Sequence, residues 1–209
     1  STKGVKGTLT CWRGNIQKLT PKKLKDFPEG DFLVAQVRKV LQPWLFSEGD
    51  ETMEELVGQL LSSHHATLAL AESCTGGLIA HRLTEVPGSS TYLDRGVVTY
   101  SNKAKQELLG VPSRTLRKYG AVSAEVAEAM AKGIREKSRV KLGVSVTGIA
   151  GPGGGSIKKP VGLVFMAIDG PNGCRSERCQ FWGDRTEIKF RSSQSALNMI
   201  RRYVLQAKA

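Results

Sequence analysis

Short apolar runs alternate with stretches of helical periodicity through most of this chain, and that alternation constrains the fold more than any other feature. Five runs predict strands, the last more polar and typical of a sheet edge: residues 67–71, 96–100, 141–147, 161–168 and 174–182. Four stretches predict helices: residues 50–63 capped by Asp50, 78–85, one beginning at Ser123, and one beginning at Asp184. The pattern predicts a three-layer α/β/α sandwich. Its mixed sheet has about five strands, and short connections allow an antiparallel meander among the last three.

Charge divides the chain into two parts. The 209 residues carry a net charge of +12, yet residues 1–25 hold seven lysines and arginines and no acid. We expect a basic N-terminal arm or extension over residues 1–31 and one domain over residues 32–209. Such an arm can contact nucleic acid, an acidic partner or a membrane surface, although a solvated tail is the more common case. No apolar run is long enough to span a membrane.

The cysteines and histidines do not form a metal pattern. Four cysteines are scattered without C-x-x-C spacing, and there are three histidines, so no zinc pattern forms and we expect reduced thiols. No secretory signal is visible, which favours the cytoplasm. The start at Ser1 also fits an organelle matrix or stroma protein after removal of a transit peptide, and a boundary within a longer protein explains it equally well.

The first candidate for chemistry follows the strand at residues 67–71. Ligands bind beyond the carboxyl ends of strands in open α/β sheets. The loop of Ser73, Thr75, Gly76 and Gly77 is expected to present free backbone N–H groups at a helix N-terminus, which favours an anion. Ser73 is then either a nucleophile or a helix cap, and the cap is the commoner use of such a serine.

A nucleophilic serine requires a base, and the histidines supply none that is well placed. His81 lies eight residues beyond Ser73 on the same predicted helix, about 12 Å along its axis. A lysine with a lowered pKa is the better candidate. Tyr100 and Lys105 follow the second predicted strand, although an exposed loop with ordinary lysines is the simpler interpretation of that segment. Cys74 is expected to be a core residue.

A glycine-rich loop follows the third predicted strand. Five glycines occur in the eight residues from Gly148 to Gly155, directly after Thr147, so the main chain can approach a ligand closely. The loop matches neither a Walker motif nor the G-x-G-x-x-G pattern. Further on, Arg185 either reaches toward a phosphate or is solvated, and the sequence leaves both open.

These segments together resemble one family, the C-terminal domain of the CinA (competence/damage-inducible) proteins. The resemblance runs from about residue 48 to residue 206. The matching segments include residues 69–80, 86–90, 98–102, 120–123, 146–154, 159–162 and 183–185. Stand-alone members of the family are nicotinamide-nucleotide amidohydrolases. The resemblance implies hydrolysis of the carboxamide of nicotinamide mononucleotide to nicotinate mononucleotide and ammonia, without a cofactor. Family members are often dimers or larger.

The resemblance also implies roles for individual residues. Ser73 would be the nucleophile and Lys105 its base, with Tyr100 assisting. The nucleotide would be held by Thr75, Gly76, Gly77, Asn102, Thr147, Gly148, Ile149, Ala150, Gly151, Pro152 and Arg185. Lys103 stands where the family commonly has Glu, and it would lower the pKa of Lys105 if the two approach.

Two other classes of function stay open. One is a nucleotide-binding but non-catalytic subunit of a larger assembly, docked through its basic arm. The other is a nucleic-acid-associated competence factor whose binding would depend on Lys22, Lys23 and Lys25 and weaken with salt.

Overall fold

The computed structural model describes residues 10–11, 45–47 and 50–206. The chain divides into two compact units, residues 1–56 and 57–209, and the division falls within helix α2, Met53–Ser63. In the first unit, β1 (Thr10–Cys11) pairs antiparallel with β2 (Leu45–Ser47). Lys22, Lys23 and Lys25, on which the nucleic-acid hypothesis depends, lie outside the described residues.

The second unit is built on a five-stranded mixed sheet in the order β4-β3-β5-β6-β7. Its strands are β3 (Leu68–Glu72), β4 (Leu93–Val98), β5 (Leu142–Gly148), β6 (Leu163–Asp169) and β7 (Arg175–Gln180). β3 runs parallel to both β4 and β5, whereas β5, β6 and β7 form an antiparallel meander. The carboxyl ends of β4, β3 and β5 therefore meet at one edge of the sheet.

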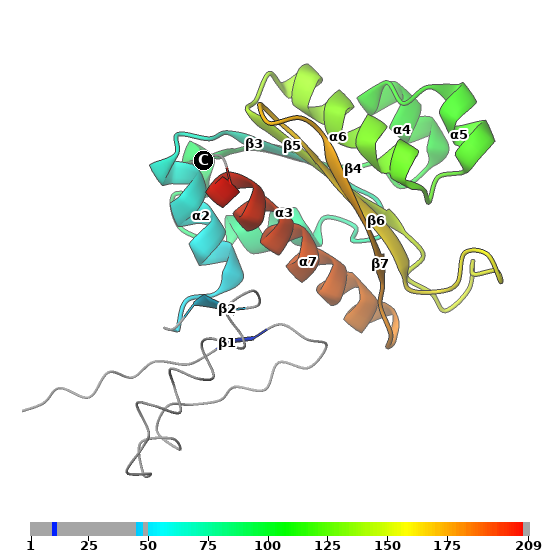
Figure 1. Cartoon of the computed structure of the whole chain (residues 1–209). Helices are drawn as coiled ribbons and strands as arrows, with labels where there is room; N and C mark the ends of the chain where they lie inside the picture. The colour runs from blue at the N-terminus through cyan, green and yellow to red at the C-terminus, as the bar shows by residue number, and fades with distance from the viewer. Residues whose placement is uncertain (1–9, 12–44, 48–49, 207–209) are drawn as a thin grey trace, which may run out of the picture. The chain divides into compact units, whose positions relative to one another are not determined.

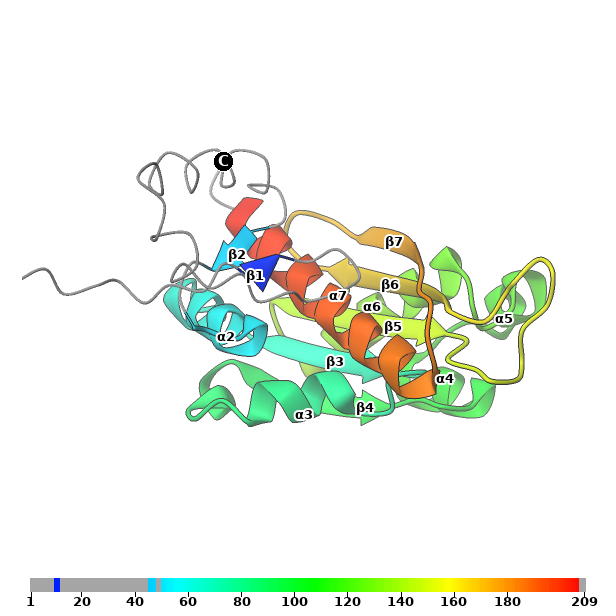
Figure 2. The ribbon, with the colours of Figure 1, turned by 90° about the horizontal axis from the view of Figure 1, so that it is seen from below.

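Helices cover both faces of the sheet (Figures 1 and 2). One face carries α4 (Asn102–Leu109), α5 (Ser113–Tyr119) and α6 (Ala124–Ser138), of which α6 packs on the strands and the other two pack on α6. The opposite face carries α3 (Leu78–Thr84) and α7 (Arg185–Gln206), which contact each other. A short 3-10 helix, η2, spans Ser89–Thr91.

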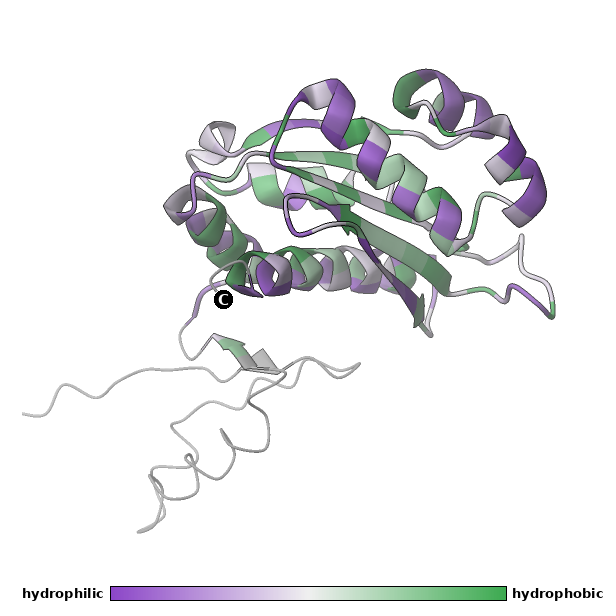
Figure 3. Cartoon of the chain, turned by 45° about the horizontal axis from the view of Figure 1, so that its top comes forward, coloured by the Kyte–Doolittle hydropathy of each residue, from purple (hydrophilic) through white to green (hydrophobic). Residues whose placement is uncertain are grey.

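The core lies between these layers because the strands are apolar on both sides (Figure 3). All five residues of β3 are buried, as expected for a central parallel strand. α6 adds Val126, Met130 and Ile134 to the core at four-residue intervals, the spacing that places them on one helix face.

The structure confirms the predicted three-layer α/β/α fold, the five-stranded mixed sheet and the meander. Two parts of the expectation were wrong. Thr52, not Asp50, caps α2: its Oγ1 accepts from the Glu55 N–H at 3.3 Å, and Glu55 accepts from the Thr52 N–H at 2.7 Å. Residues 102–109 and 113–119 form helices that the sequence analysis did not predict. Within the described ranges, no helix is both long and apolar enough to cross a membrane.

Candidate active site

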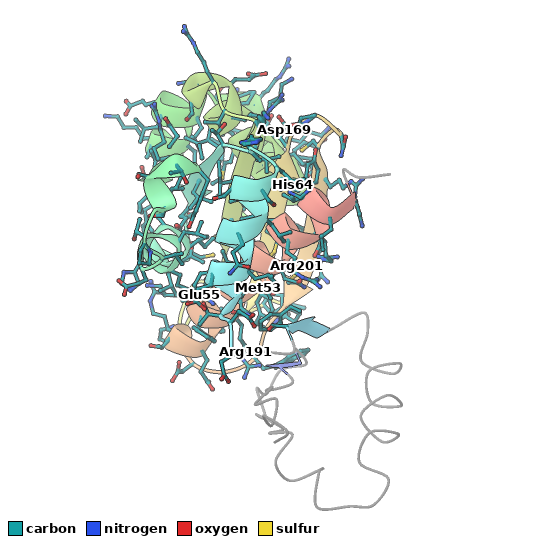
Figure 4. The ribbon with its side chains drawn as sticks, turned by 90° about the vertical axis from the view of Figure 1, so that its left-hand side faces the viewer. Met53, Glu55, His64, Asp169, Arg191 and Arg201 are labelled. Carbon is teal, nitrogen blue, oxygen red and sulfur yellow. The ribbon has the colours of Figure 1, made fainter. Side chains whose placement is uncertain are left out.

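The site lies where parallel strands β3, β4 and β5 end. Ser73 follows β3 directly, Thr99 and Tyr100 follow β4, and Gly148 closes β5. The backbone is fixed there because the Ser73 N–H donates to Val146 O at 2.9 Å and the Thr99 N–H donates to Glu72 O at 2.7 Å. Asp169, labelled in Figure 4, pairs with Gly143 at the opposite edge of the sheet, where Arg135 donates to its carboxylate at 2.9 Å.

Ser73 and Lys105 are in direct contact. Lys105 Nζ lies 3.0 Å from Ser73 Oγ, although the two residues are 32 positions apart in the sequence. A second hydrogen bond, 2.7 Å long, runs from Nζ to Thr99 O and fixes the amine from the other side. The structure therefore brings together the two groups that the sequence analysis paired as nucleophile and base.

The chain delivers Lys105 to this position on a well-capped helix. Ser101 Oγ accepts from the Ala104 N–H at 3.0 Å and starts α4 one residue later. Lys105 then projects into the interior, where its side chain is only 1% exposed. Burial disfavours the ammonium form and lowers the pKa of Lys105 below its ordinary value.

Lys103 does not contribute to that shift. Its ammonium lies 3.7 Å from the Glu107 carboxylate on the exposed face of α4. An effect of Lys103 on the pKa of Lys105 was expected only if the two side chains approach each other. The pairing with Glu107 turns Lys103 to solvent, so burial is the cause of the lowered pKa.

The N-terminus of α3 is already occupied by a carboxylate, which corrects the expectation of free N–H groups there. Glu72 is 1% exposed and accepts from the N–H groups of Gly77 at 3.0 Å, Ile79 at 3.1 Å and Ala80 at 2.8 Å. Among the described residues, no oxygen accepts a hydrogen bond from the N–H of Cys74 or Thr75. Both groups interact with the Cys74 sulfur, and they are candidate donors to an oxyanion formed at Ser73.

Tyr100 and Arg185 join two parts of the site. Arg185 Nη2 donates to the Tyr100 hydroxyl at 3.0 Å, and Nη1 donates to Gly151 O at 2.7 Å. Arg185 begins α7, and Asp184 caps that helix by accepting from the Glu187 N–H at 2.8 Å. Neither sequence interpretation of Arg185 is complete, because the guanidinium links the end of β4 to the glycine-rich loop.

The glycine-rich loop is held at its start. Thr147 is buried and donates from Oγ1 to Ala121 O at 2.8 Å. At Gly148 an added Cβ would lie 2.7 Å from Val164 Cγ2, so this glycine serves close packing of β5 on β6. The Gly151–Pro152 peptide bond is cis. Ile149 is partly exposed, Ala150 is buried and Pro152 is exposed.

Asn102 is exposed, whereas Cys74 is buried. Asn102 is exposed at the first position of α4, and no contact joins it to Ser73 or Lys105 within the described part of the chain. Cys74 is a core residue as expected, and burial raises the pKa of its thiol to about 12. No cluster of three His, Cys, Asp or Glu side chains suited to a metal ion occurs among the residues that the structure describes.

Two residues of the site were missed from the sequence. Glu72 lies in the motif at residues 69–80, but its capping role becomes visible only from the geometry of the turn. Lys189 lies on α7, with Nζ 3.5 Å from the position that a Cβ at Gly76 would take. Its four-residue spacing from Arg185 was the available signal, since residues i and i+4 share a helix face.

The family described as the CinA C-terminal domain matches residues 50–204. A CinA-like protein of Geotalea daltonii is 54% identical over 170 residues, which cover 81% of this chain and 41% of that protein. A CinA-like protein of Geotalea uraniireducens is 49% identical over 174 residues, covering 83% of this chain and 41% of that protein.

Solved structures share the fold. The crystal structure of competence/damage inducible protein CihA from Agrobacterium tumefaciens has a TM-score of 0.69 and 46% identity, covering 72% of this chain and 94% of that one. A CinA superfamily protein from Klebsiella pneumoniae has a TM-score of 0.71 and 29% identity, covering 75% and 99%. The chain thus spans about four-tenths of the length of the curated relatives but most of these crystallised chains.

Proposed function

Because the chain belongs to the CinA C-terminal domain family, we propose that it hydrolyses the carboxamide of nicotinamide mononucleotide, releasing ammonia and nicotinate mononucleotide. The observation that carries the proposal is the 3.0 Å contact between Ser73 Oγ and the buried amine of Lys105. A serine paired with a buried lysine is a recurrent arrangement for acyl transfer. A lysine that served only packing would not need its nitrogen on a serine hydroxyl.

The first half of the reaction transfers the acyl group to the enzyme. The neutral amine of Lys105 takes the Ser73 proton, and Oγ forms a bond to the carboxamide carbon. The carbonyl electron pair moves onto its oxygen, which the N–H groups of Cys74 and Thr75 stabilise. When the carbonyl reforms, the C–N bond breaks, the proton on Lys105 passes to the leaving nitrogen, and ammonia departs.

The second half regenerates Ser73. Lys105 takes a proton from water, the resulting hydroxide attacks the ester carbon, and the bond to Oγ breaks. The proton on Lys105 returns to Oγ, and the carboxylic acid that forms releases its own proton to solvent and leaves as the carboxylate. Atoms and charge balance without a metal or a redox partner. The positive pyridinium ring helps both attacks by withdrawing electrons from the carbonyl carbon.

The residues around this pair are proposed to hold the nucleotide. They form the turn at Thr75, Gly76 and Gly77, the loop from Thr147 to Pro152, Asn102, and the Arg185–Tyr100 link. Binding energy from the ribose phosphate, away from the reacting carbon, would hold the carboxamide against Ser73. Free nicotinamide lacks those contacts and should react far more slowly.

The test is ammonia release from nicotinamide mononucleotide by the purified chain. We expect turnover by the wild type, much slower turnover of free nicotinamide, and a loss on the order of 10⁴-fold or more in Ser73→Ala. Ser62→Ala, an exposed serine on α2, is the matched control and should keep wild-type activity. Wild-type protein that binds the nucleotide without releasing ammonia would be a non-catalytic subunit and would contradict the proposal, as would an active Ser73→Ala.

A further inference from the structure

Lys159 lies in the loop between β5 and β6, and the proposed chemistry gives it no part. This glycine-rich loop leaves β5 along residues 149–152 and returns to β6 along residues 159–162. Lys159 Nζ donates to Tyr119 O and to Val122 O, each at 2.7 Å. Both acceptors are main-chain oxygens where α5 gives way to α6. The lysine therefore ties the return leg of the loop to a segment 37 to 40 positions earlier in the sequence (Figure 2).

The connection between α5 and α6 is shaped to receive this ammonium. Tyr119 ends α5, and its carbonyl is one of those that a helix leaves without an intrahelical partner. Gly120 follows with φ of +75°, and a Cβ added there would lie 3.1 Å from Lys159 Nζ. Glycine thus permits the turn and also leaves the space that the ammonium occupies.

Both legs of the loop are fastened to this connection. Between the two acceptors of Lys159 lies Ala121, whose oxygen accepts from Thr147 Oγ1 at 2.8 Å. The legs also join each other, because the Gly162 N–H donates to Ile149 O at 2.7 Å. Thr147 lies in β5 and Gly162 directly before β6, so these contacts hold the base of the loop. Lys159 extends the hold along the return leg.

The return leg supports the part of the loop that is proposed to hold the nucleotide. Val161, two residues after Lys159, lies so close to Gly151 that a Cβ at Gly151 would be 2.7 Å from Val161 Cγ1. From the other side, Arg185 Nη1 holds Gly151 O at 2.7 Å. Gly151 is therefore placed between a side chain of α7 and the leg that Lys159 anchors. A displaced leg would displace Gly151 as well.

The outer part of the loop has little support of its own. Residues 152–158 are exposed, Ile157 fully so, and a Cβ added at Gly153 would meet nothing within 4 Å. A turn joins them to the return leg: the Ser156 N–H donates to Lys159 O at 2.8 Å, and the Lys159 N–H donates to Ser156 Oγ at 3.1 Å. Fixing such a segment costs conformational entropy, which anchoring contacts must offset. Lys159 makes its contacts where the exposed turn meets the packed leg.

We propose that Lys159 is a positioning residue that fixes the glycine-rich loop in its nucleotide-binding conformation before the substrate arrives. This inference rests on the proposed function, which assigns the loop to the nucleotide. An already ordered loop loses less conformational entropy on binding, so the anchor should favour the bound ground state and the transition state alike. Lys159 contacts neither Ser73 nor Lys105 in the described structure, so the chemical step should not depend on it.

The kinetic test removes the ammonium and keeps a long side chain. In Lys159→Met we expect the KM for nicotinamide mononucleotide to rise about 10- to 100-fold, as for loss of a hydrogen bond from a charged group. The kcat and the pH dependence of the rate should stay as in wild type. Lys159→Arg should restore most of the affinity, because a guanidinium can donate to both carbonyls. Lys158→Met is the matched control, since it removes the same charge from the neighbouring exposed position.

A measurement without nucleotide separates this inference from the proposed function. Amide hydrogen exchange is compared between wild type and Lys159→Met, and we expect faster exchange across residues 149–162 of the variant and unchanged exchange in β3 and α3. Calorimetry then compares their binding of nicotinamide mononucleotide. Faster exchange with weaker binding would support the anchor even if the wild type releases no ammonia. If the wild type binds no nucleotide, the proposed function fails, and the exchange result alone decides whether Lys159 fixes the loop.

Several results would overturn the inference. One is exchange in the loop that does not change in Lys159→Met, and another is unchanged affinity for the nucleotide. A rise in KM of the same size in Lys158→Met would reduce the effect to general charge, and a fall in kcat at constant KM would place Lys159 in the chemical step. Lys159 is partly exposed, so the variant is expected to fold. Should it not fold, Lys159→Gln, which keeps a polar side chain, takes the same measurements.

Discussion

Arg185 donates a hydrogen bond from Nη2 to the Tyr100 hydroxyl over 3.0 Å, although 85 positions separate the two residues. The same guanidinium holds Gly151 O at 2.7 Å. Tyr100 is 62% exposed, so packing alone does not fix its ring beside the site. The position of its hydroxyl depends on Arg185.

This link predicts non-additive effects on catalysis. Tyr100→Phe and Arg185→Gln should each lower kcat/KM for nicotinamide mononucleotide, because each removes one end of the link. Expressed as free energy, the loss of kcat/KM in the double variant should be smaller than the sum of the two single losses. The difference is a coupling energy of about 0.5–1.5 kcal/mol. A double-mutant cycle measures it. Tyr119→Phe, a tyrosine at the end of α5, should combine additively with Arg185→Gln. Additive effects of Tyr100→Phe and Arg185→Gln would show that the link plays no part in turnover.

The buried amine of Lys105 predicts the pH dependence of the rate. Only the neutral amine can take the Ser73 proton, so kcat/KM should fall as pH decreases through the pKa of Lys105. Burial lowers that pKa, so the acidic limb of the pH–rate profile should lie at a lower pH than the titration of an ordinary lysine. Cys74 does not interfere near neutral pH, because the pKa of its thiol is about 12. The measurement is kcat/KM for ammonia release across a pH series.

Two variants sharpen that measurement. Lys105→Arg keeps a charge that cannot be lost near neutral pH and should reduce kcat/KM by about 10²- to 10⁴-fold, the usual contribution of a general base. Lys103→Gln should leave the acidic limb unmoved, because the Lys103 ammonium faces Glu107. A limb that shifts in Lys103→Gln would mean that Lys103 controls the titration after all.

The residue pattern was sufficient for the fold, whereas the roles of Ser73 and Lys105 came from the family resemblance. Strands such as β3 are continuous apolar runs, and the contact of Ser73 with Lys105 follows from parallel neighbours that end at one edge of the sheet. The helices α4 and α5 were missed because each is short and contributes few side chains to the core. Only three of their fifteen residues are core side chains: Lys105, Leu109 and Leu116.

The polar contacts of Glu72 and Arg185 could not be predicted from the sequence, because they depend on the geometry of turns and loops. Glu72 reaches around the turn to donors five to eight positions later, and the sequence spacing does not indicate that direction. The hydrogen bonds of Arg185 likewise depend on where two loops end. Polar contacts between turns are set by backbone geometry, whereas burial of a strand is visible in its composition.

The Glu72 cap predicts a loss of stability when its charge is removed. Glu72→Gln retains one acceptor oxygen for three N–H groups and removes a negative charge from the helix N-terminus. The free energy of unfolding should fall by about 1–3 kcal/mol. Denaturant titration measures it, with Glu85→Gln, an exposed acid just after α3, as control. An unchanged midpoint in Glu72→Gln would mean that the cap contributes nothing net.

The glycines of the loop after β5 are predicted to differ sharply in their tolerance of a side chain. At Gly148 an added Cβ would lie 2.7 Å from Val164 Cγ2 and 2.8 Å from Leu163 O, so β5 and β6 would have to separate. Gly148→Ala should therefore cost about 1–3 kcal/mol of unfolding free energy and weaken nucleotide binding.

At Gly153 nothing lies within 4 Å of the added Cβ. Gly153→Ala should be neutral or stabilise by up to about 1 kcal/mol, because it restricts the unfolded chain. Thermal unfolding of the two variants side by side checks both values, and equal melting temperatures would show that close packing at Gly148 does not hold the loop.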